Sequence, residues 1–184
     1  MRGIVKEARY KKMNSAILLI PLFIIRYGLL GAVNKVALPR AAHFPQAQGI
    51  EKPMFLIYQL ATVAIIVYMT FLKVNTQSPV FYTGVGVYIT GVLIFAMATI
   101  NFAKPSESGI NQTGLYRFSR NPMYVAYFVY FVGCALLACS IPLAVMVCVF
   151  QIAGHWVILA EERWCEETFG DEYIQYMQKV RRYI

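Results

Sequence analysis

One stretch of the sequence decides the fold: residues 122–159 read PMYVAYFVYFVGCALLACSIPLAVMVCVFQIAGHWVIL, with no Asp, Glu, Lys or Arg. This stretch is about twice as long as the roughly 20 residues that one helix needs to cross a bilayer. A Ser-Ile-Pro sequence at residues 140–142 interrupts it with a tight turn. We therefore predict a transmembrane hairpin, with one helix over about 122–139 and a second over about 142–160.

The composition of the whole chain supports a membrane class. Of 184 residues, 59% are hydrophobic and 14% are charged, and the mean hydropathy is +0.54. Soluble domains are about 45–50% apolar and about 25% charged, so the excess apolar surface must face lipid. The formal net charge of +8 is interpreted as topology signals and contacts with anionic head groups, not as nucleic-acid binding.

Three further apolar runs precede the hairpin, at about 15–33, 54–72 and 80–102. We expect an all-α integral membrane protein with about five transmembrane helices, or four if the first run does not cross. The first run follows a basic segment and so also resembles a secretory signal, but it is long and has no small-residue cleavage site. Residues 34–53 are expected to form a polar loop.

Glycines and cysteines in the apolar runs are interpreted as packing residues. Gly84, Gly86 and Gly91 are typical of close helix contacts, and they lack the strand and basic residue that a phosphate loop needs. Three of the four cysteines lie in apolar runs and no CxxC pair exists, so no disulfide or metal site is expected. His43 and His155 also lack partners at metal-ligand spacing.

The C-terminal segment is predicted to be a separate amphipathic helix. Gly170 interrupts the chain, and Asp171 can cap the helix that follows. Apolar residues then recur at the spacing of one helix face, at Tyr173, Tyr176, Met177 and Val180. We expect this helix to lie on the membrane surface.

The hairpin places two polar segments on one side of the membrane. Its helices begin and end on the same face, so residues 103–121 and 161–184 can meet there. With five spans, six lysines and arginines lie on the N-terminal side and ten on the C-terminal side, which favours a cytoplasmic C-terminal face. The chain is expected to form a single membrane domain, 1–184, with 101–184 as its cofactor-binding, catalytic part.

Two groups of polar residues are candidates for chemistry at this face. Glu161 and Glu162 form either a solvated helix end or a site for a cation, a ribose diol or an amine, with Arg117 and Arg120 as partners. Asn121 either caps the next helix or, with the N–H groups of that helix start, receives a carboxylate.

Two motifs in this region resemble a known family. Residues 114–124, GLYRFSRNPMY, look like the "G-x-Y-x-x-x-R-H-P-x-Y" signature, and Glu161-Glu162 follow about 37 residues later. Residues 169–176, FGDEYIQY, then resemble the "F-G-x-x-Y-x-x-Y" that follows the paired glutamates in the same family. Over residues 101–182 the chain therefore resembles isoprenylcysteine carboxyl methyltransferases and related phospholipid methyltransferases.

The resemblance implies a multi-pass membrane enzyme that uses S-adenosylmethionine. A lipid or other hydrophobic substrate would enter from the bilayer, with no nucleic acid and no obligate protein partner. The positions that match the family's cofactor contacts are Asn101, Ser108, Gly109, Ile110, Asn111, Tyr116, Asn121, Pro122, Met123, Tyr124 and Glu161. The expected catalytic residues are Arg120, Tyr124 and Glu162, and Val157 is an expected substrate contact. His155 lies about two turns before Glu162 on one helix face, so it is either a further substrate contact or a packed histidine bonded to a neighbouring helix.

The sequence departs from the family pattern at informative positions. Asn121 stands where the signature has histidine, and an amide cannot titrate, which argues against acid–base chemistry there. Val157 stands where the prenylcysteine enzymes have an arginine for the substrate carboxylate, and valine cannot bind a carboxylate. The resemblance therefore transfers the cofactor and the reaction type, and leaves the substrate open.

Two other functions are alternatives to a methyltransferase. An NADPH-dependent membrane reductase of the sterol-reductase type has a similar C-terminal arrangement, but those chains are longer and have more spans. A non-catalytic scaffold or transporter subunit is the third class. Transporters carry polar residues in several spans and internal repeats, whereas here only Arg26 and His155 interrupt the apolar runs.

Overall fold

The computed structural model describes residues 13–35, 37, 39, 43–106 and 109–184, and every named secondary-structure element among them is a helix. The first helix changes its winding along its length: η1 (Ser15–Leu19) is 3-10, α1 (Ile20–Phe23) is α-helical, η2 (Ile24–Leu29) is π-helical and α2 (Leu30–Val33) is α-helical. The other helices are α4 (Glu51–Phe71), α5 (Phe81–Phe102), η3 (Gly114–Arg117), α6 (Pro122–Ala138), α7 (Ile141–Phe169) and α8 (Asp171–Lys179).

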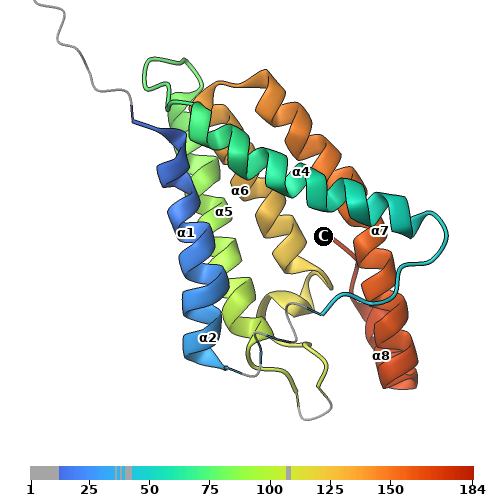
Figure 1. Cartoon of the computed structure of the whole chain (residues 1–184). Coiled ribbons are helices and arrows are strands. Elements are labelled where there is room, and N and C mark those ends of the chain that lie inside the picture. The colour runs from blue at the N-terminus through green and yellow to red at the C-terminus, as the bar shows by residue number, and fades with distance from the viewer. Residues whose placement is uncertain (1–12, 36, 38, 40–42, 107–108) are drawn as a thin grey trace, which may run out of the picture.

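The long helices form a bundle of alternating direction (Figure 1). Helix α5 packs along α6, and α4 packs along α7. At one end of the bundle Asn14 bridges Lys73, which joins the start of the first helix to the end of α4. At the other end the Asn34 side chain donates to the Ala103 carbonyl at 3.0 Å. The loop before α6 lies at this second end, together with α8.

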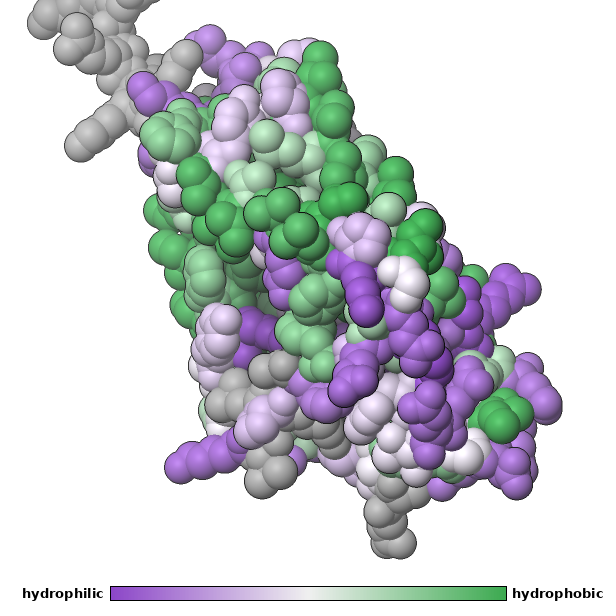
Figure 2. Space-filling model, turned by 45° about the vertical axis from the view of Figure 1, so that its right-hand side comes forward, coloured by the Kyte–Doolittle hydropathy of each residue, from purple (hydrophilic) through white to green (hydrophobic). Residues whose placement is uncertain are grey.

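The surface of the bundle is suited to lipid, which confirms the predicted class of integral membrane protein. Among the described residues, four helices are long and apolar enough to cross a membrane: Ser15–Val33, Glu51–Phe71, Phe81–Phe102 and Ile141–Phe169. Pro122–Ala138 is also apolar but shorter, at 17 residues. Figure 2 shows apolar residues over most of the bundle and polar residues gathered at the end that carries α8.

Helix α7 is longer than the sequence predicts. It continues past residue 160 to Phe169, so Glu161 and Glu162 lie inside the helix and not at its end. The interpretation of the pair as a solvated helix end is wrong, because Glu162 is only 3% exposed. The extra turns persist because their charged side chains are paired: Glu162 with Arg120, and Arg163 with Glu51.

Close contacts at glycine fix the α5–α6 pair. A Cβ atom on Gly91 would lie 2.5 Å from the Tyr130 Cα, and one on Gly133 would lie 2.5 Å from the Tyr88 Cα. Gly84 is also close to α6, so the predicted packing role is confirmed at Gly84 and Gly91. It is wrong at Gly86, where a Cβ would meet no described atom within 4 Å.

The predicted C-terminal helix is present as α8. Its apolar face packs on the protein, because Tyr173 and Tyr176 are buried in a small cluster with Ile110. Burial raises the pKa of both tyrosines, so their hydroxyl groups stay protonated and can donate. Tyr176 donates to the Tyr116 carbonyl at 2.6 Å, which holds α8 against the loop before α6.

Candidate active site

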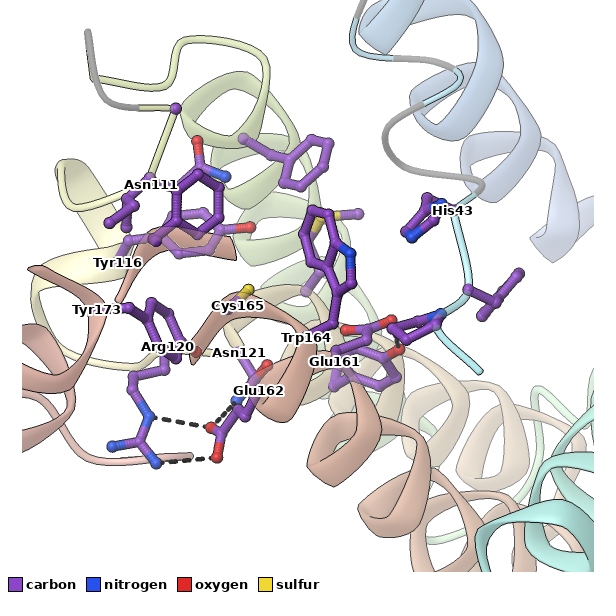
Figure 3. Close-up of a pocket in the computed structure, with 18 of the residues that line it drawn as sticks. His43, Asn111, Tyr116, Arg120, Asn121, Glu161, Glu162, Trp164, Cys165 and Tyr173 are labelled. Atoms are coloured by element: carbon purple, nitrogen blue, oxygen red, sulfur yellow. Dashed lines mark hydrogen bonds and ion pairs between the residues drawn. The ribbon is translucent and has the colours of Figure 1, made fainter. Parts of the chain in front are cut away.

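A cavity of about 200 Å³ lies where the loop before α6, α8 and the C-terminal half of α7 meet (Figure 3). Residues of the first helix, the loop before α4, α4 and α6 complete its walls. The predicted meeting of segments 103–121 and 161–184 is confirmed, because Arg120 and Glu162 form a salt bridge of 2.9 Å across them. The cavity therefore occupies the polar end of an otherwise apolar bundle.

Glu162 is the centre of a buried ion cluster. It accepts hydrogen bonds from Arg120 Nε at 2.9 Å, Asn121 Nδ2 at 3.0 Å and Arg182 Nε at 2.9 Å. Arg120 also donates from Nη1 to the carbonyls of Met177 and Val180. The cluster thus ties α7, the start of α6 and the chain after α8 into one unit. Because these charged groups bond to one another, they are suited to holding the three chain segments in position.

Asn121 takes part in this cluster and does not cap α6. It occupies the N-cap position of α6 but makes no side-chain capping bond. Its amide nitrogen donates to Glu162 and, at 3.2 Å, to the Arg182 carbonyl. The interpretation of Asn121 as a simple helix cap is therefore wrong. An amide serves this position because it donates to a carboxylate and a carbonyl at once.

Glu161, the neighbour of Glu162, lines the cavity with a different set of contacts. The Tyr124 hydroxyl donates to Glu161 Oε1 at 2.7 Å, and the charge of Arg26 acts on the same carboxylate. Arg26 and Tyr127 line the same cavity, and Tyr58 lies 6.3 Å from Tyr124 between ring centroids. We call these five residues, which come from the first helix, α4, α6 and α7, the span wall.

Planar side chains form a second side of the cavity, the aromatic wall of His43, Trp164, Phe169 and Tyr173. The His43 and Trp164 rings are 4.9 Å apart, and Phe169 meets Trp164 edge-on at 5.9 Å. In Figure 3 the Trp164 ring lies between His43 and the side of the cavity with Asn111 and Tyr116. The His43 and Phe169 rings are inclined to the Trp164 ring by 49° and 85°.

A salt bridge holds the loop that carries His43 in place. Arg163 pairs with Glu51 through both nitrogens, at 2.5 and 2.8 Å, and donates to the Gln46 carbonyl at 3.0 Å. Phe44 packs edge-on against Phe55 of α4 at 5.1 Å. The loop between the first helix and α4 is therefore part of the cavity wall, although the sequence predicts only a polar connection there.

The loop at residues 109–116 supplies an acceptor that no described protein donor satisfies. The Asn111 Oδ1 atom is buried without a hydrogen-bond partner in the described part of the chain, and Asn111 lines the cavity. Buried polar atoms nearly always have partners, so this oxygen is suited to accept from a donor in the cavity. Gly109 has a φ of +92°, which glycine adopts without strain, and this turn brings the loop to the cavity.

Most of the sequence-predicted site residues line this one cavity, and four do not. Asn101 supports the loop instead, because its Oδ1 accepts from the Leu115 N–H at 3.0 Å. His155 hydrogen-bonds with the Tyr183 hydroxyl at 2.7 Å, and Val157 and Pro122 are buried. Ser108 lies outside the described residues. Those that line the cavity are Gly109, Ile110, Asn111, Tyr116, Arg120, Asn121, Met123, Tyr124, Glu161 and Glu162.

Sequence reasoning missed the other half of the cavity. The one sequence signal for Arg26 was its charge inside an apolar run. The aromatic residues of the apolar runs gave no such signal, because aromatic residues also fill ordinary membrane helices. The residues not predicted to line it are Arg26, His43, Phe44, Pro45, Tyr58, Phe102, Tyr127, Trp164 and Cys165, together with Phe169, Tyr173 and Tyr176, which were named only in the C-terminal motif.

The fold and the cavity define an all-α membrane protein with a polar site at one end, and sequence comparison places it in a family. Residues 81–172, half of the chain, match the phospholipid methyltransferase family, so the chain belongs to that family. Similarity extends to protein-S-isoprenylcysteine O-methyltransferase from Saccharomyces cerevisiae, with 34% identity over 79 residues. That match covers 42% of this chain and 33% of the yeast protein, so the chain spans about a third of that relative.

Proposed function

We propose that this protein is an S-adenosylmethionine-dependent methyltransferase whose acceptor is a lipid or another hydrophobic molecule of the membrane. Membership of the phospholipid methyltransferase family supports the reaction type. The observation that carries the proposal is the pairing, in one cavity, of the Glu161 carboxylate with the unsatisfied Asn111 oxygen. The apolar helices around the cavity support an acceptor that arrives from the bilayer.

The residues of the cavity fit this cofactor by their chemistry. A carboxylate such as Glu161 suits an ammonium group or a ribose diol, and the Asn111 oxygen suits an N–H or O–H donor. The aromatic wall provides planar faces for a purine ring. We therefore assign cofactor binding to Glu161, to the loop at 109–111 and to the aromatic wall.

The protein's part in the reaction is alignment and exclusion of water. S-adenosylmethionine, when bound, supplies an electrophilic methyl group on a sulfonium. The protein must hold the acceptor in line with that methyl group, and this ordering contributes much of the rate. Tyr58, Tyr124 and Tyr127 on the span wall exclude water. Arg120 and Glu162 act as positioning residues, because their cluster fixes the start of α6 against the end of the chain.

Ligand-dependent melting of the detergent-purified protein tests this proposal. S-adenosylhomocysteine at about 100 times its dissociation constant should stabilise the protein by roughly 2.7 kcal/mol. Glu161→Ala should lose this shift, because the ligand loses its carboxylate partner. Glu167→Ala is the matched control, since Glu167 is on the same helix but exposed.

The arms of this experiment separate the candidate functions. Stabilisation of the wild type by S-adenosylhomocysteine, together with its loss in Glu161→Ala alone, supports the assignment. Stabilisation by NADPH instead would replace the methyltransferase with a reductase. A full S-adenosylhomocysteine shift in a folded Glu161→Ala variant would remove Glu161 from the cofactor site.

A further inference from the structure

A second hollow lies between α8 and the loop before α6, apart from the candidate active site. We call it the α8 cleft. It has a volume of about 390 Å³ and is lined by Gln112, Arg117, Glu172, Gln175, Tyr176, Lys179 and Val180. Among these residues only Tyr176 also lines the cavity of the candidate active site, so the α8 cleft is a separate space.

The two sides of the α8 cleft run side by side in the same chain direction. Three hydrogen bonds, each between residues 60 positions apart, join them: Gln112 to Glu172 at 3.2 Å, Tyr176 to Tyr116 at 2.6 Å, and Arg120 to Val180 at 3.0 Å. Glu172 therefore lies at one end of the cleft, and Arg117 lies toward the other end with Lys179. Seven residues of helix separate Glu172 from Lys179, a rise of roughly 10 Å.

Arg117 and Lys179 are exposed cations with no ion pair in the described part of the chain. The sequence-based pairing of Arg117 with the two glutamates is wrong, because Glu162 is bonded to Arg120 and Arg182 instead. Two positive charges from two chain segments thus line one polar cleft without a counter-charge of their own.

The end of α8 does not oppose an anion at this place. A helix C-terminus ordinarily disfavours negative charge, because its last carbonyl oxygens are unpaired. Here Arg120 donates to the carbonyls of Met177 and Val180. Glu172, the carboxylate of the cleft, accepts from Gln112 about two helical turns away. An anion beside Arg117 and Lys179 is therefore next to two positive charges and distant from the negative one.

Exposed apolar side chains indicate that this end of the molecule lies at the level of lipid head groups. Phe118, the residue after Arg117, is 74% exposed, and Ile174 of α8 is 40% exposed. Large apolar residues beside basic ones are typical of segments in the membrane interface, where anionic lipid head groups attract Lys and Arg. Arginine binds a phosphate through two parallel N–H donors, and lysine binds it as a point charge.

We propose that the α8 cleft is a binding site for a phosphate group, which Arg117 and Lys179 hold together. A phospholipid head group and a soluble phosphate ester share this chemistry, and the exposed Phe118 and Ile174 favour the lipid. The inference goes beyond the proposed function, because the ligand is bound outside the cavity and is not methylated. A phosphate there links η3 to α8, two elements that both carry residues of the cavity wall.

Probes with the same tails isolate the contribution of the phosphate. Dihexanoylphosphatidylglycerol carries a phosphodiester, whereas dihexanoylglycerol carries no charge. Their binding to the protein, purified in a neutral detergent, is measured by titration calorimetry. We expect the phospholipid to bind about tenfold or more tightly, which corresponds to about 1.4 kcal/mol.

A third probe, glycerol 3-phosphate at the same ionic strength, distinguishes the sources of the phosphate. Weaker binding than that of the phospholipid assigns the cleft to a lipid head group. Equal binding, lost in the same variants, assigns it to a soluble phosphate ester. Both results support a phosphate site.

Four variants assign the binding to the α8 cleft. Arg117→Gln and Lys179→Gln should each weaken phospholipid binding by about tenfold, because each removes one of two charged partners. Arg117→Lys should restore part of the affinity, since lysine keeps the charge but not the paired N–H donors. Arg181→Gln is the matched control and should stay within about threefold of the wild type, because Arg181 is exposed nearby but does not line the cleft. All of these side chains are exposed, so the variants should melt like the wild type without ligand.

Three results would overturn the inference. The first is that dihexanoylglycerol binds as tightly as the phospholipid. The second is that Arg117→Gln and Lys179→Gln keep the full phospholipid affinity. The third is that Arg181→Gln loses as much affinity as Arg117→Gln, which would show that net charge attracts the lipid and that the cleft does not select it. None of these measurements uses S-adenosylhomocysteine, so the methyltransferase proposal stands or falls separately.

Discussion

Glu161 and Glu162 are adjacent on α7 but have different surroundings, and they therefore have different roles. Successive residues of a helix point about 100° apart, so Glu161 faces Tyr124 and the cavity whereas Glu162 faces Arg120, Asn121 and Arg182. The Glu161 carboxylate lines the cavity beside Tyr124. The second is saturated by protein donors, as a buried carboxylate must be if it is to remain charged.

This difference predicts opposite phenotypes at neighbouring positions. Glu162→Ala should lower the free energy of unfolding by about 3–5 kcal/mol, because it leaves the Arg120 charge buried without its partner. Thermal melting in detergent without ligand measures this loss. Glu161→Ala should be destabilised less under the same conditions, because the hydrogen bond that it loses comes from the neutral Tyr124 hydroxyl, and it should lose the ligand-dependent shift. Equal destabilisation of the two variants would contradict the division of roles.

The pairing of these residues was only partly predictable. The sequence places Arg120 and the two glutamates on one membrane face, because a hairpin returns the chain to the side from which it started. It cannot say which glutamate takes the arginine, since that depends on the rotation of α7. Trp164 and His43 are 121 positions apart in the chain, and only the packed fold reveals that their rings meet.

At the scale of helices, the α5–α6 contact depends on two glycines that face each other's helix. Gly91→Ala should destabilise the protein by about 1–3 kcal/mol, because the new methyl group would lie 2.5 Å from Tyr130 backbone atoms and force the helices apart. Gly86→Ala is a control on the same helix and should be neutral or slightly stabilising, since alanine favours helix. Thermal melting of the two variants side by side measures the difference.

Helix positions were far easier to predict than helix ends and faces. Because a helix must be long and apolar to cross a bilayer, the bounds of four predicted apolar runs agree with the helix bounds to within about three residues. The C-terminal extension of α7 escaped prediction because its charged residues look solvated until their partners Arg120 and Glu51 are placed. Likewise, hydropathy alone does not separate Gly86 from Gly91, because both lie in one uniformly apolar helix.

At the scale of the whole molecule, the distribution of basic residues predicts that the cavity opens to the cytoplasm. Cys139, exposed at the turn between α6 and α7, lies at the opposite end. In spheroplasts of a bacterial expression host, an impermeant maleimide should label Cys139 from outside. A Gln178→Cys variant, with its new thiol on α8, should be labelled only after permeabilisation.

Controls make this topology experiment decisive. Cys139→Asn should abolish labelling of intact spheroplasts, and asparagine tolerates the left-handed backbone at that position, where φ is 49°. Cys148 is exposed on the bundle surface within a candidate span, so lipid should shield it. Labelling of the α8 thiol in intact spheroplasts would invert the proposed orientation.

The cavity draws its walls from two parts of the chain, and this division separates two kinds of evolutionary change. Residues 109–176 supply the Asn111 and Glu161 side, within or beside the family-matched segment, whereas Arg26, His43 and Tyr58 come from the unmatched N-terminal half. The N-terminal half can therefore change its Arg26 and Tyr58 side of the cavity without touching Asn111 or Glu161. His43 is the exception, because it joins this half to the aromatic wall through Trp164.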